Sequence, residues 1–333
     1  MERLYWNNDW KFAETWEEAM KEAVYPENEM EDVRLPHTCK ELPYHYFDEH
    51  AYQMLCGYRR HFMAPEAWRG KSVELTFEGV AHDSVVYVNG REVKTHHCGY
   101  TAFSMELGEF LKYGEDNVLA VRVDSREDLN IPPFGYAIDY MTFGGIYREV
   151  YVQVRSKTHL ADVFLKPQIY PQQLTSEITV QGDCKGVTVQ QAIRKRGQGD
   201  FSLLGERKLQ KQNVQTVFPA NGIVLWEPEH PQLYEIRTQL WKENEMLDER
   251  VDITGFREAV FRKDGFYLNG KKLRLRGLNR HQSYPYVGYA APSSLQIMDA
   301  DILKHELGVN AVRTSHYPQS QDFITRCDEL GLL

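Results

Sequence analysis

Hydrophobic and polar positions alternate with a period of two along most of residues 1–155. The run Gly145–Arg155 shows the pattern clearly, since valines fill every second position of its last half. An Asn89-Gly90 pair separates two other alternating runs, and this dipeptide in such a place is a strong signal for a β-hairpin. Many short strands with glycine and proline turns predict a sandwich, jelly roll or barrel for this part of the chain.

The next hundred residues, 156–254, carry further strand-like runs separated by turn signals such as Gly182-Asp183 and Asn221-Gly222. This spacing is typical of an immunoglobulin-like β-sandwich. No acid pair, Ser/His set or metal-type cluster stands out, so we interpret the domain as a structural spacer. The predicted strands are Ala161–Lys166, Ser176–Gln181, Thr188–Ile193, Asn213–Phe218, Tyr234–Trp241 and Asp248–Ile253.

The period changes again in residues 255–333. Two strand-like runs, Leu273–Asn279 and Val309–His316, flank a helical pattern over Ser293–Leu307, with Ser293 or Ser294 as its expected N-cap. A second helical pattern begins at Ser320 and meets a glycine stop. The order strand–helix–strand–helix predicts the beginning of a parallel α/β unit.

Both predicted strands of this unit end in polar clusters that finish in a histidine, His281 and His316. In a (β/α)8 barrel, the C-terminal ends of the strands carry the chemistry. The two histidines are therefore candidates for the edge of an active site. The alternative is that each is a buried histidine with a structural hydrogen bond.

A long aromatic loop, Asn130–Gly145, holds one carboxylate, Asp139, between Ile138 and Tyr140. Carboxylate oxygens accept hydrogen bonds from pairs of sugar hydroxyls, and aromatic rings pack on the C–H face of a sugar. The loop is a candidate sugar-binding element. The alternative is a packed interdomain loop in which Asp139 caps a turn.

Composition limits the classes of function. The chain has 333 residues, of which 26% are charged and 42% hydrophobic, as in globular proteins of two or three domains. Its formal net charge of −9 argues against nucleic acid as a partner, because gripping phosphates needs a basic face. The densest basic run, Arg194-Lys195-Arg196, lies in a glycine-flanked loop.

Targeting signals and disulfides are not expected either. The N-terminal stretch has no apolar core of signal-peptide length, and no apolar run is long enough for a membrane span. The five cysteines are scattered, without a Cys-x-x-Cys pair or zinc spacing. Reduced thiols in a cytoplasmic protein are the simplest interpretation.

Two stretches carry a resemblance to a known family. GLNRH (Gly277–His281) and NAVRTSHYP (Asn310–Pro318) resemble the first barrel strands of glycoside hydrolase family 2, the β-galactosidases and β-glucuronidases. The resemblance implies a jelly-roll sugar-binding domain over 1–155, an immunoglobulin-like sandwich over 156–254 and the start of a (β/α)8 barrel over 255–333. Further matching segments are NNDWKF, VRLPHT, GVAHDSVVYVNG, FGGIYREV and LWEPEHPQLYEI.

The resemblance also implies a reaction. It indicates the N-terminal part of a retaining glycoside hydrolase that cleaves terminal β-D-galactosides. Such enzymes use two carboxylates, which lie on later barrel strands in relatives, beyond residue 333. We therefore expect a truncated barrel of two βα units, no catalytic residue in this chain, and no activity of the chain alone.

Roles for individual residues follow from the resemblance. Asp139 is expected to reach the barrel mouth and contact the substrate, and His281 and His316 to donate to sugar hydroxyls. Arg313 is expected to pair with the nucleophile carboxylate through its guanidinium group. The family usually has a glutamate where this chain has Gln282, which puts an acidic role there in doubt.

Cofactors and partners are expected to be few. The chain itself should need no cofactor, although Mg²⁺ or Na⁺ can bind near the sugar in the full-length parent, mostly through downstream residues. A metal site built from Asp139, His281 and His316 remains an alternative. The expected partner is a carbohydrate, and the parent is expected to be a homo-oligomer.

Other functions stay open at this point. A β-glucuronidase or β-mannosidase of the same family would share these motifs, although the GLNRHQSYPYVGYA and DYMTFGGIYREV stretches look more like β-galactosidases. A non-catalytic carbohydrate-binding module or a structural protein would explain the β domains. Neither of these explains the two barrel strands.

Overall fold

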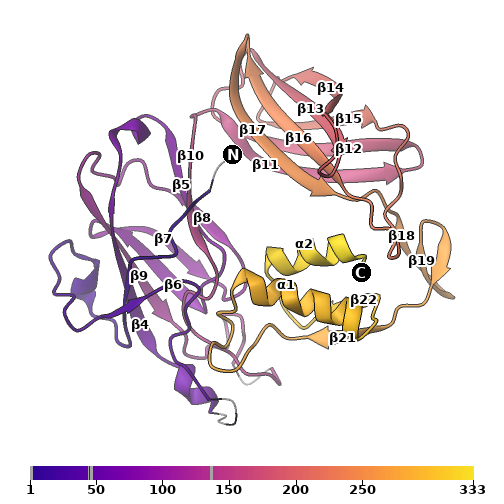
Figure 1. Ribbon diagram of the computed structural model, residues 1–333. Coiled ribbons are helices and arrows are strands. Elements are labelled where there is room, and N and C mark those ends of the chain that lie inside the picture. The colour runs from indigo at the N-terminus through magenta and orange to yellow at the C-terminus, as the bar shows by residue number, and fades with distance from the viewer. Residues whose placement is uncertain (1–2, 44, 46–47, 136–137) are drawn as a thin grey trace.

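The computed structural model describes residues 3–43, 45, 48–135 and 138–333 and shows two β-sandwiches with a small α/β unit packed against both (Figure 1). Tyr136 and Ala137, which belong to the predicted sugar-binding loop, lie outside the described residues. No described helix has both the length and the apolar character that a membrane crossing requires.

The first sandwich confirms the expected jelly-roll architecture. A six-stranded sheet, in the order β3-β2-β4-β9-β6-β7, packs on a four-stranded sheet, β1-β10-β5-β8. Their inward faces share one core of buried aromatic and aliphatic side chains. The strands are β1 (Leu4–Tyr5), β2 (Trp10–Ala13), β3 (Glu31–Val33), β4 (Leu55–Met63), β5 (Ser72–Phe77), β6 (Asp83–Val88), β7 (Arg91–His97), β8 (Phe103–Glu106), β9 (Asp116–Asp124) and β10 (Val150–Arg155). Short 3₁₀ turns span Glu18–Lys21, Glu49–Tyr52 and Glu66–Trp68.

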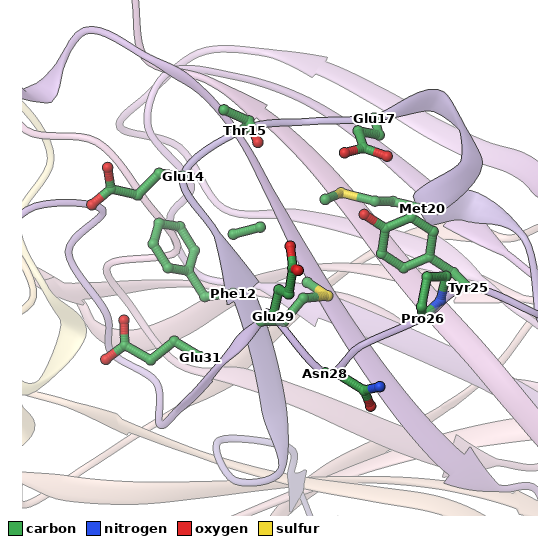
Figure 2. A pocket seen from close by; sticks show the side chains of 12 residues that line it. Phe12, Glu14, Thr15, Glu17, Met20, Tyr25, Pro26, Asn28, Glu29 and Glu31 are labelled. Carbon is green, nitrogen blue, oxygen red and sulfur yellow. The ribbon is translucent and has the colours of Figure 1, made fainter.

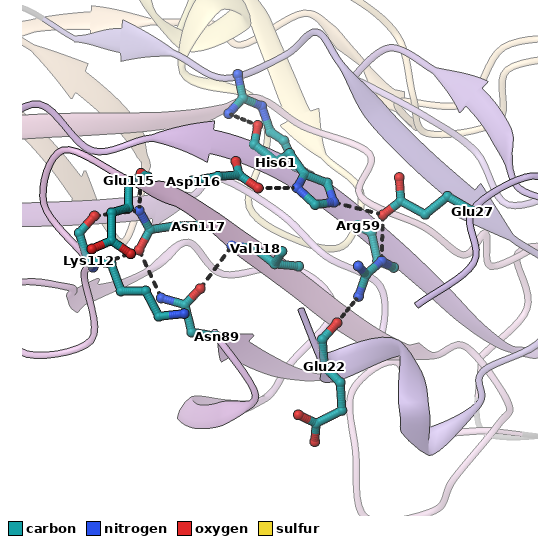
Figure 3. A network of polar contacts seen from close by, with 11 residues as sticks. Glu22, Glu27, Arg59, His61, Asn89, Lys112, Glu115, Asp116, Asn117 and Val118 are labelled. Carbon is teal, nitrogen blue, oxygen red and sulfur yellow. Dashed lines mark hydrogen bonds and ion pairs between the residues drawn. The ribbon is translucent and has the colours of Figure 1, made fainter. Parts of the chain in front are cut away.

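The predicted hairpin between β6 and β7 is confirmed. Asn89 and Gly90 have φ angles of 51° and 82°, the left-handed pair that a two-residue hairpin turn with the sheet's own twist requires. The buried side chain of Asn117 fixes this turn, because its Oδ1 accepts from Asn89 Nδ2 at 2.8 Å and from Lys112 N at 2.8 Å (Figure 3).

The same view shows how the segment before β3 is held on the sheet. The guanidinium of Arg59, fully buried on β4, donates to the Glu27 carboxylate at 2.7 Å and to the Glu22 carbonyl at 2.9 Å (Figure 3). His61 lies between Glu27 and Asp116, with ring nitrogens 3.2 and 2.7 Å from their carboxylates. A buried charge paired in this way anchors the loop to the strand.

The predicted strand Gly145–Arg155 is shorter than expected. Only β10, from Val150, joins the sheet. Gly145 has a φ of 117°, and a Cβ there would come within 2.6 Å of the His37 carbonyl. Gly145 instead forms an isolated antiparallel bridge with Ala81, and the chain joins the four-stranded sheet only from Val150.

The second sandwich has the expected immunoglobulin-like form, with sheets β11-β12-β15 and β14-β13-β16-β17. The sequence did not indicate β14, whose side chains are mostly exposed because it is an edge strand paired only with β13. Without a buried face, it lacks the alternation that marks a strand. The strands are β11 (His159–Ile169), β12 (Gln172–Gln181), β13 (Val187–Lys195), β14 (Ser202–Lys208), β15 (Asn213–Pro219), β16 (Tyr234–Lys242) and β17 (Glu245–Thr254).

The α/β unit begins with an antiparallel sheet of β18 (Ala259–Arg262), β19 (Gly265–Leu268) and β20 (Lys271–Leu273). The predicted strand Leu273–Asn279 is thus two strands, since Leu273 ends β20 and the barrel strand β21 (Gly277–Arg280) starts later. The hairpin between β19 and β20 pulls the first half of the run into its own sheet.

Two βα units follow, as predicted. β21 pairs in parallel with β22 (Ala311–Thr314), α1 (Ser293–Asp301) continues as a π-helical turn, Ile302–Glu306, and α2 (Gln321–Leu330) closes the unit. The start and stop of α2 are confirmed. Ser320 caps its N-terminus by accepting from Asp322 N, and Gly331 takes the left-handed conformation after its end.

The predicted N-cap of α1 is wrong. The N-cap is Pro292, and no side chain caps the helix. Ser293 instead donates its hydroxyl to the Glu149 carboxylate of the jelly roll at 3.3 Å. Local sequence rules assign the Ser293 side chain to the helix cap, but it forms an interdomain hydrogen bond instead.

Candidate functional site

The jelly-roll loop and the two barrel strands meet at one edge of the molecule. The ring of Tyr140, next to Asp139 in the loop, has its centroid 5.0 Å from that of His281 and 6.1 Å from that of His316. The two histidine rings lie 5.7 Å apart at 89°. The structure therefore brings the candidate residues of two distant segments into one group.

The parallel pairing of β21 and β22 places the histidines side by side. Arg280 pairs with Thr314 in register, and Ser315 N donates to the Arg280 carbonyl at 3.1 Å, which joins the two strand ends. His281 and His316 follow directly beyond this bond, and both side chains are exposed. Strand ends in register thus account for the pairing of two histidines that are far apart in sequence.

Asp139 is exposed, and its side chain interacts electrostatically with His281 of the same group. Burial lowers the pKa of His281 below its ordinary value, and repulsion from His316 lowers it further, whereas attraction to Asp139 raises it. The net shift is downward, so His281 is neutral at neutral pH. The edge presents one carboxylate and one neutral imidazole, a combination suited to hydrogen bonding with hydroxyl groups.

Tyr317 supports His281 from behind. Its ring is 5% exposed and stacks on Tyr100 with centroids 4.5 Å apart at 7°. Its hydroxyl accepts from Gln282 N at 3.2 Å and lies 3.3 Å from His281 Nδ1. The first histidine is therefore held at one ring nitrogen by a rigid phenol.

Arg313 stands apart from this group. It is exposed, in register with Asn279, and Val312 before it packs on the helices. Alternation along the strand turns Arg313 to the face away from α1 and α2. Over the described ranges it forms no ion pair or side-chain hydrogen bond, so its expected pairing with a carboxylate stays a prediction.

Arg280 and Gln282, on either side of His281 in the sequence, have structural roles. Arg280 points into the helices, where its Nε donates to Asp299 at 2.8 Å, and its side chain lies on the Phe323 ring at 4.1 Å. Gln282 is fully buried, and its Oε1 accepts from Arg148 of the jelly roll at 3.0 Å. Arg148 also donates to the Pro318 carbonyl at 2.7 Å.

These bonds define the role of the side chain at position 282. The side chain is turned into the domain interface, where it accepts a hydrogen bond from a buried arginine, and it does not face the mouth. Sequence reasoning missed the interface role of Arg148 and the support given by Tyr140 and Tyr317. The signal that could have found the two tyrosines is their position, because Tyr140 follows Asp139 and Tyr317 follows His316 directly.

A metal centre is not assembled at this edge. In the part of the chain that the structure describes, no three His, Cys, Asp or Glu side chains are placed to hold an ion together. Asp139, His281 and His316 therefore do not form the three-ligand site considered as an alternative.

The jelly roll has a separate hollow of about 570 Å³ that shares no lining residue with the group (Figure 2). In this view Glu14, Glu29 and Glu31 lie around Phe12, and Glu17 lies across the hollow near Met20 and Tyr25. Glu14 is already paired with Lys40 at 2.8 Å. The hollow lies on the segment that Arg59 anchors, away from the strand ends.

Sequence profiles of one family match almost the whole chain. The "Glycosyl hydrolases family 2, sugar binding domain" matches residues 11–155, "Glycosyl hydrolases family 2" matches 158–257, and "Glycosyl hydrolases family 2, TIM barrel domain" matches 260–333.

Individual proteins agree with the profiles. The chain is 44% identical over 99% of its length to a β-galactosidase of Thermoanaerobacter pseudethanolicus, covering 45% of that protein, and 43% identical over 98% of its length to one of Thermoanaerobacterium thermosulfurigenes, covering 47%. A crystal structure of Bacteroides uniformis β-glucuronidase superposes with a TM-score of 0.87 at 29% identity, over all of this chain and 41% of that one. The chain thus spans less than half the length of these relatives.

Proposed function

Because this chain belongs to glycosyl hydrolases family 2, we propose that it forms the N-terminal part of an enzyme that cleaves terminal β-D-galactosides. Its role is to supply part of the sugar-binding rim. The observation that carries this proposal is the meeting of the Asp139–Tyr140 loop segment with His281 and His316 at the ends of two barrel strands.

The group has the chemistry that a sugar requires. A sugar hydroxyl both donates and accepts, so it is matched by a carboxylate that accepts and an imidazole that donates. Asp139 and His281 provide these two functions, and the Tyr140 ring offers an apolar surface next to them. His316 is a second imidazole at the same edge.

The reaction requires groups that we place on other barrel strands. Retaining glycosidases use an acid/base and a nucleophile carboxylate about 5–5.5 Å apart. We assign neither role to any residue of 1–333. Arg313, exposed on the face of β22 turned away from the helices, is the group that we propose pairs with the nucleophile.

A galactoside is favoured over a glucuronide by the relatives. Two proteins named β-galactosidase share 43–44% identity with nearly all of this chain, whereas the B. uniformis β-glucuronidase shares 29%. The group at the edge also contains an anionic side chain, Asp139, which would repel the carboxylate of a glucuronide at short range.

A chimera tests the proposal. Residues 1–333 would replace the matching segment of the T. pseudethanolicus β-galactosidase, and kcat/KM would be measured on aryl β-galactoside, β-glucuronide and β-mannoside. We expect a clear preference for the galactoside. A preference for either other substrate would overturn the assignment, and a folded chimera that binds galactose without turnover would favour a carbohydrate-binding module.

A further inference from the structure

We propose that Tyr317 holds His281 in the neutral tautomer with the proton on Nε2, so that the ring presents a hydrogen-bond donor at the open edge. The tautomer is a property of this chain alone. Its use in binding a sugar hydroxyl rests on the function proposed above. Tyr317 acts as a positioning residue, since it reaches a ligand only through His281.

The Tyr317 hydroxyl makes two polar contacts. Tyr317 Oη accepts a hydrogen bond from Gln282 N at 3.2 Å, and a backbone amide can only donate. His281 Nδ1 lies 3.3 Å from the same oxygen. The first contact fixes the orientation of the hydroxyl, because one lone pair is engaged and the proton must point elsewhere.

Two arrangements remain for the second contact. In one, Tyr317 donates its proton to Nδ1, and His281 carries its own proton on Nε2. In the other, Nδ1–H donates to Tyr317, and the phenol proton needs another acceptor. Tyr317 is 5% exposed, so water does not readily supply that acceptor. A buried donor without a partner is costly, which favours the first arrangement.

The neighbouring Tyr289 is the competing acceptor for the phenol proton. Its hydroxyl also interacts with that of Tyr317, and it donates to the Met141 carbonyl at 3.2 Å. A neutral imidazole nitrogen is a stronger base than a phenol oxygen and therefore the better acceptor. The proton of Tyr317 goes to His281.

The phenol is rigid enough to impose this choice. Tyr100 stacks on one side of Tyr317, and the ring of Tyr289 lies 5.5 Å from it. The backbone N–H of Gln282 donates to the Tyr317 hydroxyl, and the Gln282 side chain is fixed in turn by its hydrogen bond from Arg148. Neither partner can move without breaking contacts between the jelly roll and the barrel unit.

The tautomer of His281 decides which hydrogen bonds it can offer a ligand. Burial and His316 lower the pKa of His281, so the ring is neutral near pH 7 and the tautomer decides what it offers. A ring with Nε2–H donates, and the nearby Asp139 carboxylate accepts. One hydroxyl of a bound sugar can satisfy both, and the chain Tyr317–His281–hydroxyl strengthens each bond by polarisation.

Nitrogen NMR on the 333-residue chain tests the tautomer directly. With ¹⁵N-labelled histidine, long-range proton–nitrogen correlations at pH 8 distinguish protonated from bare ring nitrogens, and the His281→Phe spectrum identifies the His281 signals. We expect the proton on Nε2. A proton on Nδ1 in the wild-type chain, or equal populations of both tautomers, would overturn the proposal without any variant of Tyr317.

Substitutions test the cause. In Tyr317→Phe we expect His281 to lose its single tautomer and show a mixture. Tyr289→Phe removes the competing acceptor, and Tyr100→Phe keeps the stacked ring while removing a hydroxyl that bonds to Tyr140 and Tyr289 and not to His281. Both should retain Nε2–H. An unchanged tautomer in a folded Tyr317→Phe chain would show that Tyr317 is not the cause.

The functional consequence is measured separately in the chimera. Tyr317→Phe should lower kcat/KM on the aryl β-galactoside about tenfold, the effect of one lost hydrogen bond. The control Tyr170→Phe, at an exposed tyrosine between β11 and β12 of the second sandwich, should leave it near the parent value. If the NMR result holds but the chimera acts on another substrate, the proposed substrate is wrong and the tautomer assignment stands. If the galactosidase activity holds but the NMR result fails, only the role of Tyr317 is wrong.

Discussion

At the scale of single residues, the exposed side chains of the group should affect rate more than stability. Asp139 is exposed in a loop. A surface substitution of this kind usually changes the free energy of unfolding by less than about 0.5 kcal/mol.

Asp139→Asn in the active chimera should therefore lose most activity with an unchanged melting temperature. Losing a preorganised charged contact costs about 2–4 kcal/mol in transition-state stabilisation. Steady-state kinetics and thermal denaturation check the two halves. Asp128→Asn, which removes a charge two residues before the loop and keeps an acceptor for Asn130 N, should leave kcat/KM unchanged. Parental activity in Asp139→Asn would mean that Asp139 only shapes the loop.

His316→Phe keeps the ring volume and removes both ring nitrogens. His316 is exposed at the strand end, so we expect a near-normal melting temperature and a kcat/KM lower by about 10²-fold, or ~3 kcal/mol. His305→Phe, the same change at an exposed position on the π-helical turn, is the control. A large fall in melting temperature with intact kcat/KM of the folded fraction would assign His316 a structural role.

At the scale of elements, the contact between the jelly roll and the helices contains acidic groups that oppose one another. Burial raises the pKa of Glu78 and of Glu149 above their ordinary values, and Asp322 in the first turn of α2 adds repulsion to both. Arg3 opposes the shift at both sites, and Arg148 does so at Glu78. The folded state therefore binds protons at these carboxyls more tightly than the unfolded state does.

The raised pKa values predict how the stability of the fold changes with pH. A raised carboxyl pKa contributes stability that is fully present below the unfolded value near 4.5 and is lost as pH rises through the folded value. Glu149→Gln keeps an acceptor for Ser293 and removes the charge. Its melting temperature should exceed that of the wild type at pH 7 and approach it near pH 4. A difference that does not shrink with acid would contradict the assignment.

Glu329→Gln should behave in the opposite way. Burial would raise the pKa of Glu329, but its bonds with Arg326 and Arg196 prevail, and the net pKa is lowered. Its carboxylate stabilises the fold at neutral pH and loses that effect as pH falls. Glu329→Gln should therefore be less stable than the wild type at pH 7, where Glu149→Gln is more stable.

The parallel pair β21–β22 should be the least protected sheet of the chain. Its two strands form a sheet of their own, whereas β6 lies between β7 and β9 in the six-stranded sheet. Open edges expose backbone amides to exchange. Hydrogen exchange should therefore be faster for 309–314 than for Val85–Val88. Equal protection of the two segments would disprove this expectation.

At the scale of the whole molecule, the barrel unit is held by both sandwiches. Arg148 joins it to the jelly roll, and Trp226 of the second sandwich donates to the Asp328 carbonyl of α2 at 2.8 Å. Gly331 lies so close to Pro228 that a Cβ would meet its carbonyl at 2.1 Å. The two βα units are thus ordered by their neighbours as well as by their own small core.

The isolated 333-residue chain should not hydrolyse aryl β-galactosides. It carries the proposed sugar rim, but no pair of its carboxylates is assigned the acid/base and nucleophile roles of the mechanism. A chromogenic assay on purified chain, with the T. pseudethanolicus enzyme as positive control, decides this. Turnover that co-purifies with the chain above an empty-vector background would disprove it.

Local chemistry by itself determined many elements of this protein. The hairpin turn at Asn89-Gly90 was predictable because both residues must take positive φ angles, which few other pairs tolerate. The ends of α2 were predictable because Ser320 and Gly331 satisfy groups within one turn of the chain. The motifs also placed the two histidines at strand ends and an acid in the aromatic loop.

Only the tertiary structure decided which polar residues face the open edge. Successive side chains of a strand alternate between its two faces, so Arg280 and His281 are expected to point to opposite sides. The packing of α1 and α2 decides that Arg280 is the buried one. The bond from Arg148 to Gln282 joins residues 134 positions apart, and the support of His281 by Tyr317 spans 36. Contacts at such separations depend on how whole domains pack, and no local pattern encodes them.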